Sequence, residues 1–176
     1  HKEYRRQRQM CIRDSNREGL CLVGLPGDEP WDSLSMPEAR RRTGKKLSEL
    51  DFNTPTQLYK DLSSLHPLLD YWNPLGRTMI VNSGAGGWFP PHKDQPLLTR
   101  DTFRVCAFIS NNVTHDAYEW HMDGRVWPIK AGGVYYINTK KTHRTHAWKD
   151  NSLHLVMNIP KTWENVLKLM SATLNY

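Results

Sequence analysis

The second half of the chain alternates short apolar runs with turn residues. Glycine, proline, asparagine and aspartate bound these runs, and β-branched and aromatic residues fill them, which is typical of strands. The runs are Arg77 to Asn82, Phe103 to Ser110, Tyr118 to Met122, Arg125 to Ile129, Gly133 to Asn138 and Ser152 to Ile159. Asp123-Gly124, between two alternating segments, predicts a hairpin. Many short strands without intervening helices predict a mainly β fold, an antiparallel sandwich or jelly roll.

Helical patterns flank this region on both sides. A short helix is expected to start at Met36 to Arg42. A longer one is expected from Thr54, which would cap it, with Pro55 in its first turn and Pro67 ending or kinking it. Near the C-terminus, apolar residues from Trp163 to Leu174 fall on one helical face, which predicts a helix packed against the sheet.

Length and composition fit one domain. The chain has 176 residues, of which 38% are hydrophobic, and its three cysteines show no spacing of a disulfide framework. We therefore expect a single domain over residues 16–176, with an N-terminal helical region and a C-terminal helix. No apolar run approaches the roughly 20 residues that span a bilayer, and the N-terminus lacks the apolar stretch of a signal peptide. The expected location is the cytoplasm, with no membrane partner.

The formal net charge of +6 invites a nucleic-acid interpretation. The first 15 residues carry half of it, with five basic and two acidic residues. Residues 5 to 15 resemble the translation of a transposon-type sequencing-library adapter, so residues 1–15 are interpreted as an adapter artefact of metagenomic origin or a disordered tail. The rest of the chain is nearly balanced, and the cluster from Arg40 to Lys46 is interpreted as a solvated helix end. The charge therefore does not favour nucleic acid as a partner.

Two histidine-containing segments carry candidate metal ligands. In SGAGGWFPPHKD, two prolines hold the chain extended, so that His92 and Asp94 point the same way and can bind one metal ion. NTKKTHRTHAWKD adds His143 or His146 just after an apolar strand. Two histidines and one carboxylate leave open coordination positions, which suits non-haem Fe(II). Trp88, just before the first motif, is expected at the mouth of the site.

These motifs resemble the Fe(II)/2-oxoglutarate-dependent oxygenases, in particular the aspartyl/asparaginyl and prolyl hydroxylase-like proteins of phages and bacteria. The resemblance extends from Arg77 to Ile159 and rests on FPPHKD, FRVCAFIS, GGVYYINTKKTH and the later Leu-Val strand. It implies a double-stranded β-helix (jelly roll), with His92, Asp94 and His143 as ligands of a catalytic Fe(II). It also implies 2-oxoglutarate and O2 as cosubstrates. The carboxylate of Asp94 favours hydroxylation over halogenation.

The resemblance also implies a cation for the distal carboxylate of 2-oxoglutarate. Many members have an arginine about ten residues after the distal histidine, where this chain has Leu153. The aspartyl-hydroxylase branch has an arginine on the strand after the first ligand, and Arg104 matches it. Further candidates for cosubstrate binding are Ser83, Arg144, Ser152 and His154.

Two functions follow as expectations. The first is a dioxygenase that hydroxylates a peptide or protein side chain, an amino acid or another small molecule. The alternative is a cupin-like module without catalysis, in which the same ligands hold zinc or no metal. The sequence does not indicate the substrate or the oligomeric state.

Overall fold

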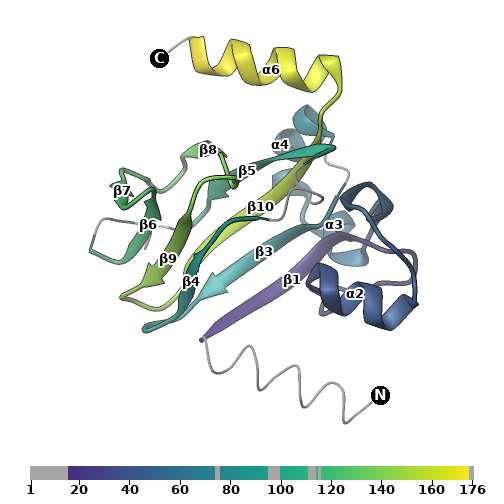
Figure 1. The fold of residues 1–176 in the computed structure, drawn as a ribbon, viewed down its shortest axis with the longest axis horizontal. Helices are drawn as coiled ribbons and strands as arrows, with labels where there is room; N and C mark the ends of the chain where they lie inside the picture. Colours follow the sequence, from purple (N-terminus) through teal and green to yellow (C-terminus); the bar gives the residue numbers. More distant parts are fainter. Residues whose placement is uncertain (1–15, 74–75, 95–99, 111–113, 115, 175–176) are drawn as a thin grey trace.

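The chain forms two antiparallel sheets (Figure 1). The computed structural model describes residues 16–73, 76–94, 100–110, 114 and 116–174, so the segment interpreted as an adapter lies outside the described residues. The larger sheet has the strand order β2-β1-β3-β10-β5-β8, and the smaller sheet has the order β4-β9-β6-β7. The strands are β1 (Arg17–Gly24), β2 (Thr54–Pro55), β3 (Thr78–Ser83), β4 (Trp88–His92), β5 (Thr102–Phe108), β6 (Tyr118–Met122), β7 (Arg125–Trp127), β8 (Val134–Ile137), β9 (His143–Ala147) and β10 (Ser152–Pro160).

The strands from β3 to β10 have the connectivity of a jelly roll. The first of them, β3, pairs with the last, β10, and the second, β4, pairs with the next to last, β9. The nesting continues inward with β5 against β8 and β6 against β7. Such nested antiparallel pairing across two sheets defines the double-sheet jelly roll. The predicted mainly β, jelly-roll fold is therefore confirmed.

The predicted hairpin at Asp123-Gly124 joins β6 to β7. Both residues have positive φ, 49° and 77° respectively, and the strands that they join pair directly at Met122 and Arg125. Positive φ at both central residues is the type I′ geometry, which aspartate and glycine tolerate best.

Helices cover the outer face of the larger sheet. The helical segments are α2 (Met36–Thr43), η1 (Glu49–Asp51), α3 (Gln57–Asp61), η2 (Ser63–Leu65), α4 (His66–Trp72) and α6 (Trp163–Leu174). Leu69 and Trp72 of α4 pack in one buried cluster with Leu155 and Met157 of β10. A second cluster, which includes Phe108, Tyr118 and Ile137, fills the space between the two sheets.

The long helix expected from Thr54 is divided. Thr54 and Pro55 form β2 against β1, and the buried Thr56 hydroxyl donates to the Cys21 carbonyl at 2.8 Å. These bonds hold the backbone extended where a helix was expected to begin, so α3 begins only at Gln57. Pro67 lies in the first turn of α4 and does not end a helix, because proline needs no hydrogen-bond partner there.

The C-terminal helix α6 has the predicted bounds, and its Leu169 packs against the buried cluster that holds Leu155 and Met157 of β10, but most of its apolar side chains do not. Trp163, Leu167 and Met170 are exposed, with Trp163 at 77%. Instead, Lys168 Nζ donates to the Tyr71 carbonyl at 2.7 Å, which ties α6 to the end of α4. The helix lies beyond the strands and not along a sheet face (Figure 1).

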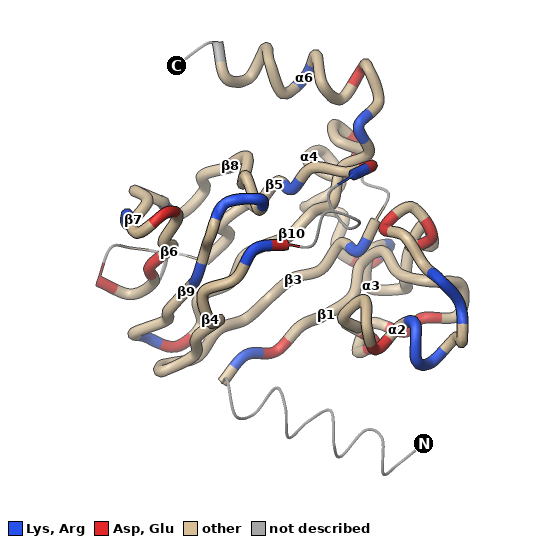
Figure 2. The backbone as a smooth tube through the Cα atoms, viewed as in Figure 1, with Lys and Arg blue, Asp and Glu red and all other residues tan. Residues whose placement is uncertain are grey.

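Lys and Arg residues gather at α2 and in the segment that follows it (Figure 2). Arg42 forms ion pairs with Asp28 and Asp32, and Arg40 donates to the Leu47 carbonyl at 2.7 Å. These contacts agree with a helix end stabilised by cations at its C-terminus.

None of the helices in the described part of the chain is long and apolar enough to cross a membrane. The cytoplasmic location stays a prediction.

Leu155→Ala tests the core between the larger sheet and its helices. Leu155 is fully buried, so its truncation leaves a cavity, and we expect a loss of about 2–5 kcal/mol in the free energy of unfolding. Val126→Ala, at a side chain that is 42% exposed, should change it by less than about 0.5 kcal/mol. Urea denaturation of both variants measures the difference, and equal effects would contradict this packing.

Candidate metal centre

His92, Asp94 and His143 converge at one end of the space between the sheets. Each offers one ligand atom, and these atoms lie within 4.8 Å of one another. His92 Nε2 is 3.6 Å from Asp94 Oδ1, and the centroids of the two imidazole rings are 4.1 Å apart. Within the ranges that the structure describes, no other group of three histidine, cysteine or acidic side chains meets this condition.

A β-bulge in β4 brings His92 opposite His143. Phe89 pairs with Thr145, and His92 pairs with His143. Between these two pairs β4 advances by three residues and β9 by two, so β4 contains one extra residue. Residues three apart on a regular strand point to opposite faces, since side chains alternate along it. In a regular strand Phe89 and His92 would therefore face opposite sides, and the bulge removes this difference. Both instead line the same cavity. The bulge falls at Pro90 and Pro91, on a strand at the edge of its sheet, where proline is tolerated.

Both imidazoles turn the same nitrogen toward the site. His92 Nδ1 lies 2.9 Å from the Pro90 carbonyl, and His143 Nδ1 lies 3.0 Å from the Lys141 carbonyl. A carbonyl only accepts, so each Nδ1 carries a proton and each Nε2 is the nitrogen that faces the other ligands of the triad. This is the arrangement in which histidine binds a metal, with the second nitrogen bonded to the protein.

Asp94 is held by its backbone and by cationic neighbours. Its N–H donates to the Thr139 carbonyl at 2.9 Å, which fixes the residue beside the loop before β9. Arg104 Nη1 lies 2.9 Å from Asp94 Oδ2 as an ion pair. Burial raises the pKa of Asp94, but the hydrogen bond with His92 and the charge of Arg104 outweigh it and hold the pKa well below its usual range. The carboxylate is therefore ionised and ready to bind a cation.

His143 is kept neutral. Burial is the main cause that lowers its pKa, and the neighbouring His92 adds to it. The ring lies parallel to Trp120, at 7° and 6.1 Å between centroids. A neutral imidazole is the form that binds a metal ion.

His146 lies on the other face of β9. The strand alternates, with His143, Thr145 and Ala147 buried and Arg144 exposed. His146, three residues after His143, lies on the opposite face and packs against Trp148, with the ring centroids 4.0 Å apart and the planes tilted by 51°. The alternation leaves His143 as the histidine of this strand at the site.

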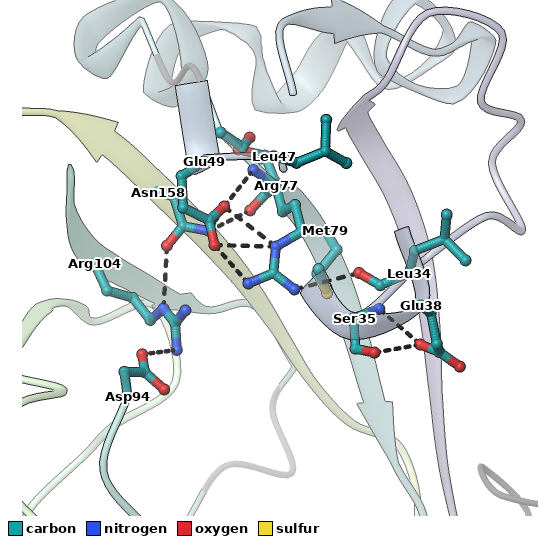
Figure 3. A network of polar contacts seen from close by, with 12 residues as sticks. Leu34, Ser35, Glu38, Leu47, Glu49, Arg77, Met79, Asp94, Arg104 and Asn158 are labelled. Atoms are coloured by element: carbon teal, nitrogen blue, oxygen red, sulfur yellow. Dashed lines mark hydrogen bonds and ion pairs between the residues drawn. The ribbon is translucent and has the colours of Figure 1, made fainter. Parts of the chain in front are cut away.

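A chain of polar contacts connects Asp94 to the buried Glu49 (Figure 3). Arg104 Nε donates to Asn158 Oδ1 at 3.3 Å, and Asn158 Nδ2 donates to Glu49 Oε2 at 3.3 Å. Glu49 in turn pairs with Arg77 at 2.5 Å and is only 2% exposed. Each buried charge has a partner, which offsets the cost of its desolvation. The contacts thus connect Glu49, Arg77, Asn158, Arg104 and Asp94 into one network.

The triad forms part of the wall of a cavity of about 330 Å³. Phe89 and Trp120 contribute aromatic walls, and the even-numbered residues His154, Val156 and Asn158 of β10 contribute the opposite side. A second cavity of about 160 Å³ shares Asp94, Arg104 and Asn158 with the first. The larger volume is in the range of small-molecule sites.

The residues predicted to bind a cosubstrate lie at three kinds of position. Arg104 and His154 line the larger cavity. Ser83 and Ser152 are buried and face each other across β3 and β10, next to the cavity but outside its lining. Arg144 is exposed on the outer face of β9 and does not reach the site. Trp88 pairs with the outward His146, so Phe89 takes the place at the cavity that was expected for Trp88.

Comparison with known proteins gives a likeness of fold only. No family profile matches the chain, and no curated protein matches it significantly. Solved structures that resemble it include KdgF from a Halomonas species, with 15% identity and a TM-score of 0.38 over 50% of this chain and 71% of that one. A predicted oxalate decarboxylase from Thermotoga maritima has 17% identity and a TM-score of 0.37 over 54% and 72%. A Cupin 2 conserved barrel domain protein from Salinispora arenicola has 13% identity and a TM-score of 0.36 over 54% and 71%. Such a likeness carries no argument about activity or ligand.

Sequence reasoning missed several residues of the cavity. Arg17, Trp120 and Asn158 line it but lie in no metal-binding pattern, and Phe89 lies in the FPPHKD motif without having been expected at the cavity. The alternation of β10 gave one usable signal, because a residue two positions from another on a strand shares its face. Asn158 could have been placed by this rule together with His154.

His143→Ala tests the metal centre, with His146→Ala as its matched control on the same strand. Removal of a ligand should weaken Zn(II) or Co(II) binding by more than about 100-fold, since even residues that only support a ligand cost 10–100-fold. His146→Ala should bind as the unchanged protein does, because its ring points away from the triad. Metal titration by competition with a chelating dye measures both, and equal losses would contradict the assignment.

His154→Gln tests the burial of the histidine on β10. Burial, with a smaller contribution from Arg17, lowers the pKa of His154 to about 3. The unfolded chain takes up a proton near pH 6.5 but the folded chain does not, so acidification from pH 6.5 toward 3 favours unfolding by up to about 1.4 kcal/mol per pH unit. The variant lacks this contribution. The difference in the free energy of unfolding between the unchanged protein and His154→Gln should therefore become smaller as the pH falls from 7 to 5. Urea denaturation across this range measures it, and parallel pH profiles would contradict it.

Proposed function

We propose that the protein is an Fe(II)- and 2-oxoglutarate-dependent dioxygenase that hydroxylates an amino-acid side chain or a small molecule. The observation that carries the proposal is the convergence of His92, Asp94 and His143 on a cavity wall, with both Nδ1 atoms bonded to backbone carbonyls and so both Nε2 atoms left for a metal. Two histidines and one carboxylate form the donor set of non-haem Fe(II) oxygenases, which leaves coordination positions for other ligands.

The donor set fits Fe(II) on the chemistry of its residues. His92 and His143 would bind through Nε2, and Asp94 through its ionised carboxylate. When bound, Fe(II) with 2-oxoglutarate and O2 supplies oxidation of a substrate C–H bond, with release of succinate and carbon dioxide. The protein's own contribution is to fix the ligands, orient the substrate and exclude water.

Arg104 serves the site in two ways in this proposal. Its ion pair orients the Asp94 carboxylate, while Asn158 holds its Nε. Its remaining nitrogen, Nη2, is left to bind a carboxylate of 2-oxoglutarate in the cavity. Leu153, at the position where an arginine was expected, is an odd-numbered residue of β10, like Leu155 and Met157 in the core against the helices. Its side chain therefore belongs to the face opposite the cavity.

The walls of the cavity limit access of water to the triad. Phe89 packs edge-on against the His92 ring at 4.3 Å, and Trp120 covers the His143 ring. A substrate would enter beside these rings, where apolar contacts favour its aliphatic part. The cavity volume agrees with a free amino acid or a single side chain of a peptide.

A non-catalytic metal-binding module is the second candidate. One observation favours it: Arg104, the predicted anchor for 2-oxoglutarate, is already paired with Asp94 and Asn158. Under this alternative the purified protein would hold zinc in equal stoichiometry and would not respond to 2-oxoglutarate.

The activity is tested on protein loaded with Fe(II) under anaerobic conditions. Addition of 2-oxoglutarate should produce a weak visible absorption band, and air should then release succinate. Asp94→Ala should reduce succinate release by more than about 100-fold, because the carboxylate ligand is lost.

Asp116→Ala is the matched control, since its carboxylate is 71% exposed and pairs only with surface groups. It should release succinate at the rate of the unchanged protein. No absorption band together with no succinate from the unchanged protein would reject the dioxygenase and favour the module.

A further inference from the structure

Arg17 lines the cavity, and none of the carboxylates that the structure describes is its counter-ion. It is the first residue of β1 and pairs with Ser83 of β3. Its guanidinium stacks on the Phe89 ring at 4.4 Å to the centroid, so that it joins the larger sheet to β4 at the cavity. Within the described part of the chain, no carboxylate forms an ion pair with it, and its buried Nε has no hydrogen-bond partner.

Further polar atoms beside Arg17 are also buried and unpaired. Trp120 Nε1 and His154 Nδ1 have no hydrogen-bond partner among the residues with a described position, and both side chains line the same cavity. The two rings lie 6.3 Å apart, edge to face. Tryptophan and arginine nitrogens only donate, so two of these three groups can be satisfied only by an acceptor.

Arg17 is half-buried, and burial of its Nε without a hydrogen-bond partner is costly, because buried polar groups are nearly always paired. Contact of its Cζ with the face of Phe89 does not use the N–H groups of the guanidinium, and these can bind a carboxylate with two parallel hydrogen bonds. Burial lowers the pKa of Arg17, which is the sign of a charge that water does not solvate well. The missing partner is therefore an anion that enters the cavity from outside.

We propose that Arg17, with Trp120 and His154 beside it, forms a second anion-binding position in the cavity that holds a carboxylate of the organic ligand. The position lies near the triad, because Trp120 also stacks on His143. Two ligands could bring this carboxylate: the cosubstrate 2-oxoglutarate or an acidic substrate such as aspartate. The choice between these sources rests on the proposed function, whereas the anion-binding position does not.

The variant Arg17→Met separates a binding role from a structural one. Removal of an unpaired buried charge should leave the melting temperature without ligand unchanged or higher, whereas a structural arginine would lower it on replacement. Glutarate, a dicarboxylate probe, should raise the melting temperature of the unchanged protein but not that of Arg17→Met. Arg17→Lys keeps the charge without the fork and should bind glutarate weakly, and it remains informative if Arg17→Met does not fold.

Zn(II)-loaded protein then identifies the source of the carboxylate. If 2-oxoglutarate supplies it, the unchanged protein should bind 2-oxoglutarate about 10–100-fold more tightly than 2-oxopentanoate, which lacks the distal carboxylate, and Arg17→Met should lose this preference. If the substrate supplies it, the preference for 2-oxoglutarate should survive. In that case, protein saturated with 2-oxoglutarate should prefer aspartate to asparagine, and Arg17→Met should lose that preference. Quenching of tryptophan fluorescence reports each titration, since Trp120 lies at the position.

Arg144→Met is the matched control, because Arg144 is exposed on the outer face of β9. It should keep every preference of the unchanged protein. The inference is overturned if the unchanged protein prefers neither 2-oxoglutarate to 2-oxopentanoate nor aspartate to asparagine. It is also overturned if Arg17→Met keeps every preference that the unchanged protein shows. Failure of the proposed function looks different: no succinate is released while Arg17-dependent binding of glutarate persists.

Discussion

Strand β10 lies between β3 and β5 and is buried on both faces, so its two-residue alternation fixes the core and the site together. Its odd-numbered residues Leu155, Met157 and Ile159 pack against the helices. Its even-numbered residues His154 and Asn158 face the cavity. A shift of one residue in its pairing would place leucine and isoleucine in the cavity and polar side chains in the core. The register of this strand therefore couples the stability of the fold to the geometry of the metal centre.

The polar side chains next to β10 are stable in the interior because each charge has a partner of opposite sign. Glu49 neutralises Arg77, and Arg104 neutralises Asp94, while Asn158 bridges the two pairs. Gly76 packs on Asn158 so closely that an added Cβ would lie 2.8 Å from the Asn158 Cβ, and its φ of 123° suits glycine alone. The side-chain amide of Asn158 therefore has little conformational freedom. Because it contacts both Glu49 and Arg104, Glu49 helps to position the Arg104 guanidinium. Arg17 stands outside this arrangement, as a cation that contacts Phe89 but forms no ion pair with any described residue.

The sequence predicted the jelly roll from strands that alternate cleanly, and it located β6 with its hairpin correctly. The strands β4 and β9, which carry His92 and His143, were not recognised as strands. Their composition explains the omission, because β4 contains two prolines and β9 contains His, Arg and Thr where apolar residues were sought. The choice between His143 and His146 also depended on knowing that β9 is a strand. Arg17 could not be found at all, since its role arises from a pairing with Ser83 that is remote in sequence.

The two prolines of β4 have a consequence for the free molecule as well. β4 is an edge strand, and such an edge offers unpaired N–H groups on which a strand of another molecule can be added. Pro90 and Pro91 have no N–H, and the bulge interrupts the ladder at the same place. The segment that presents His92 to the cavity is thus a poor template for intermolecular sheet growth, and the side of the protein that must stay open to a ligand is protected against aggregation.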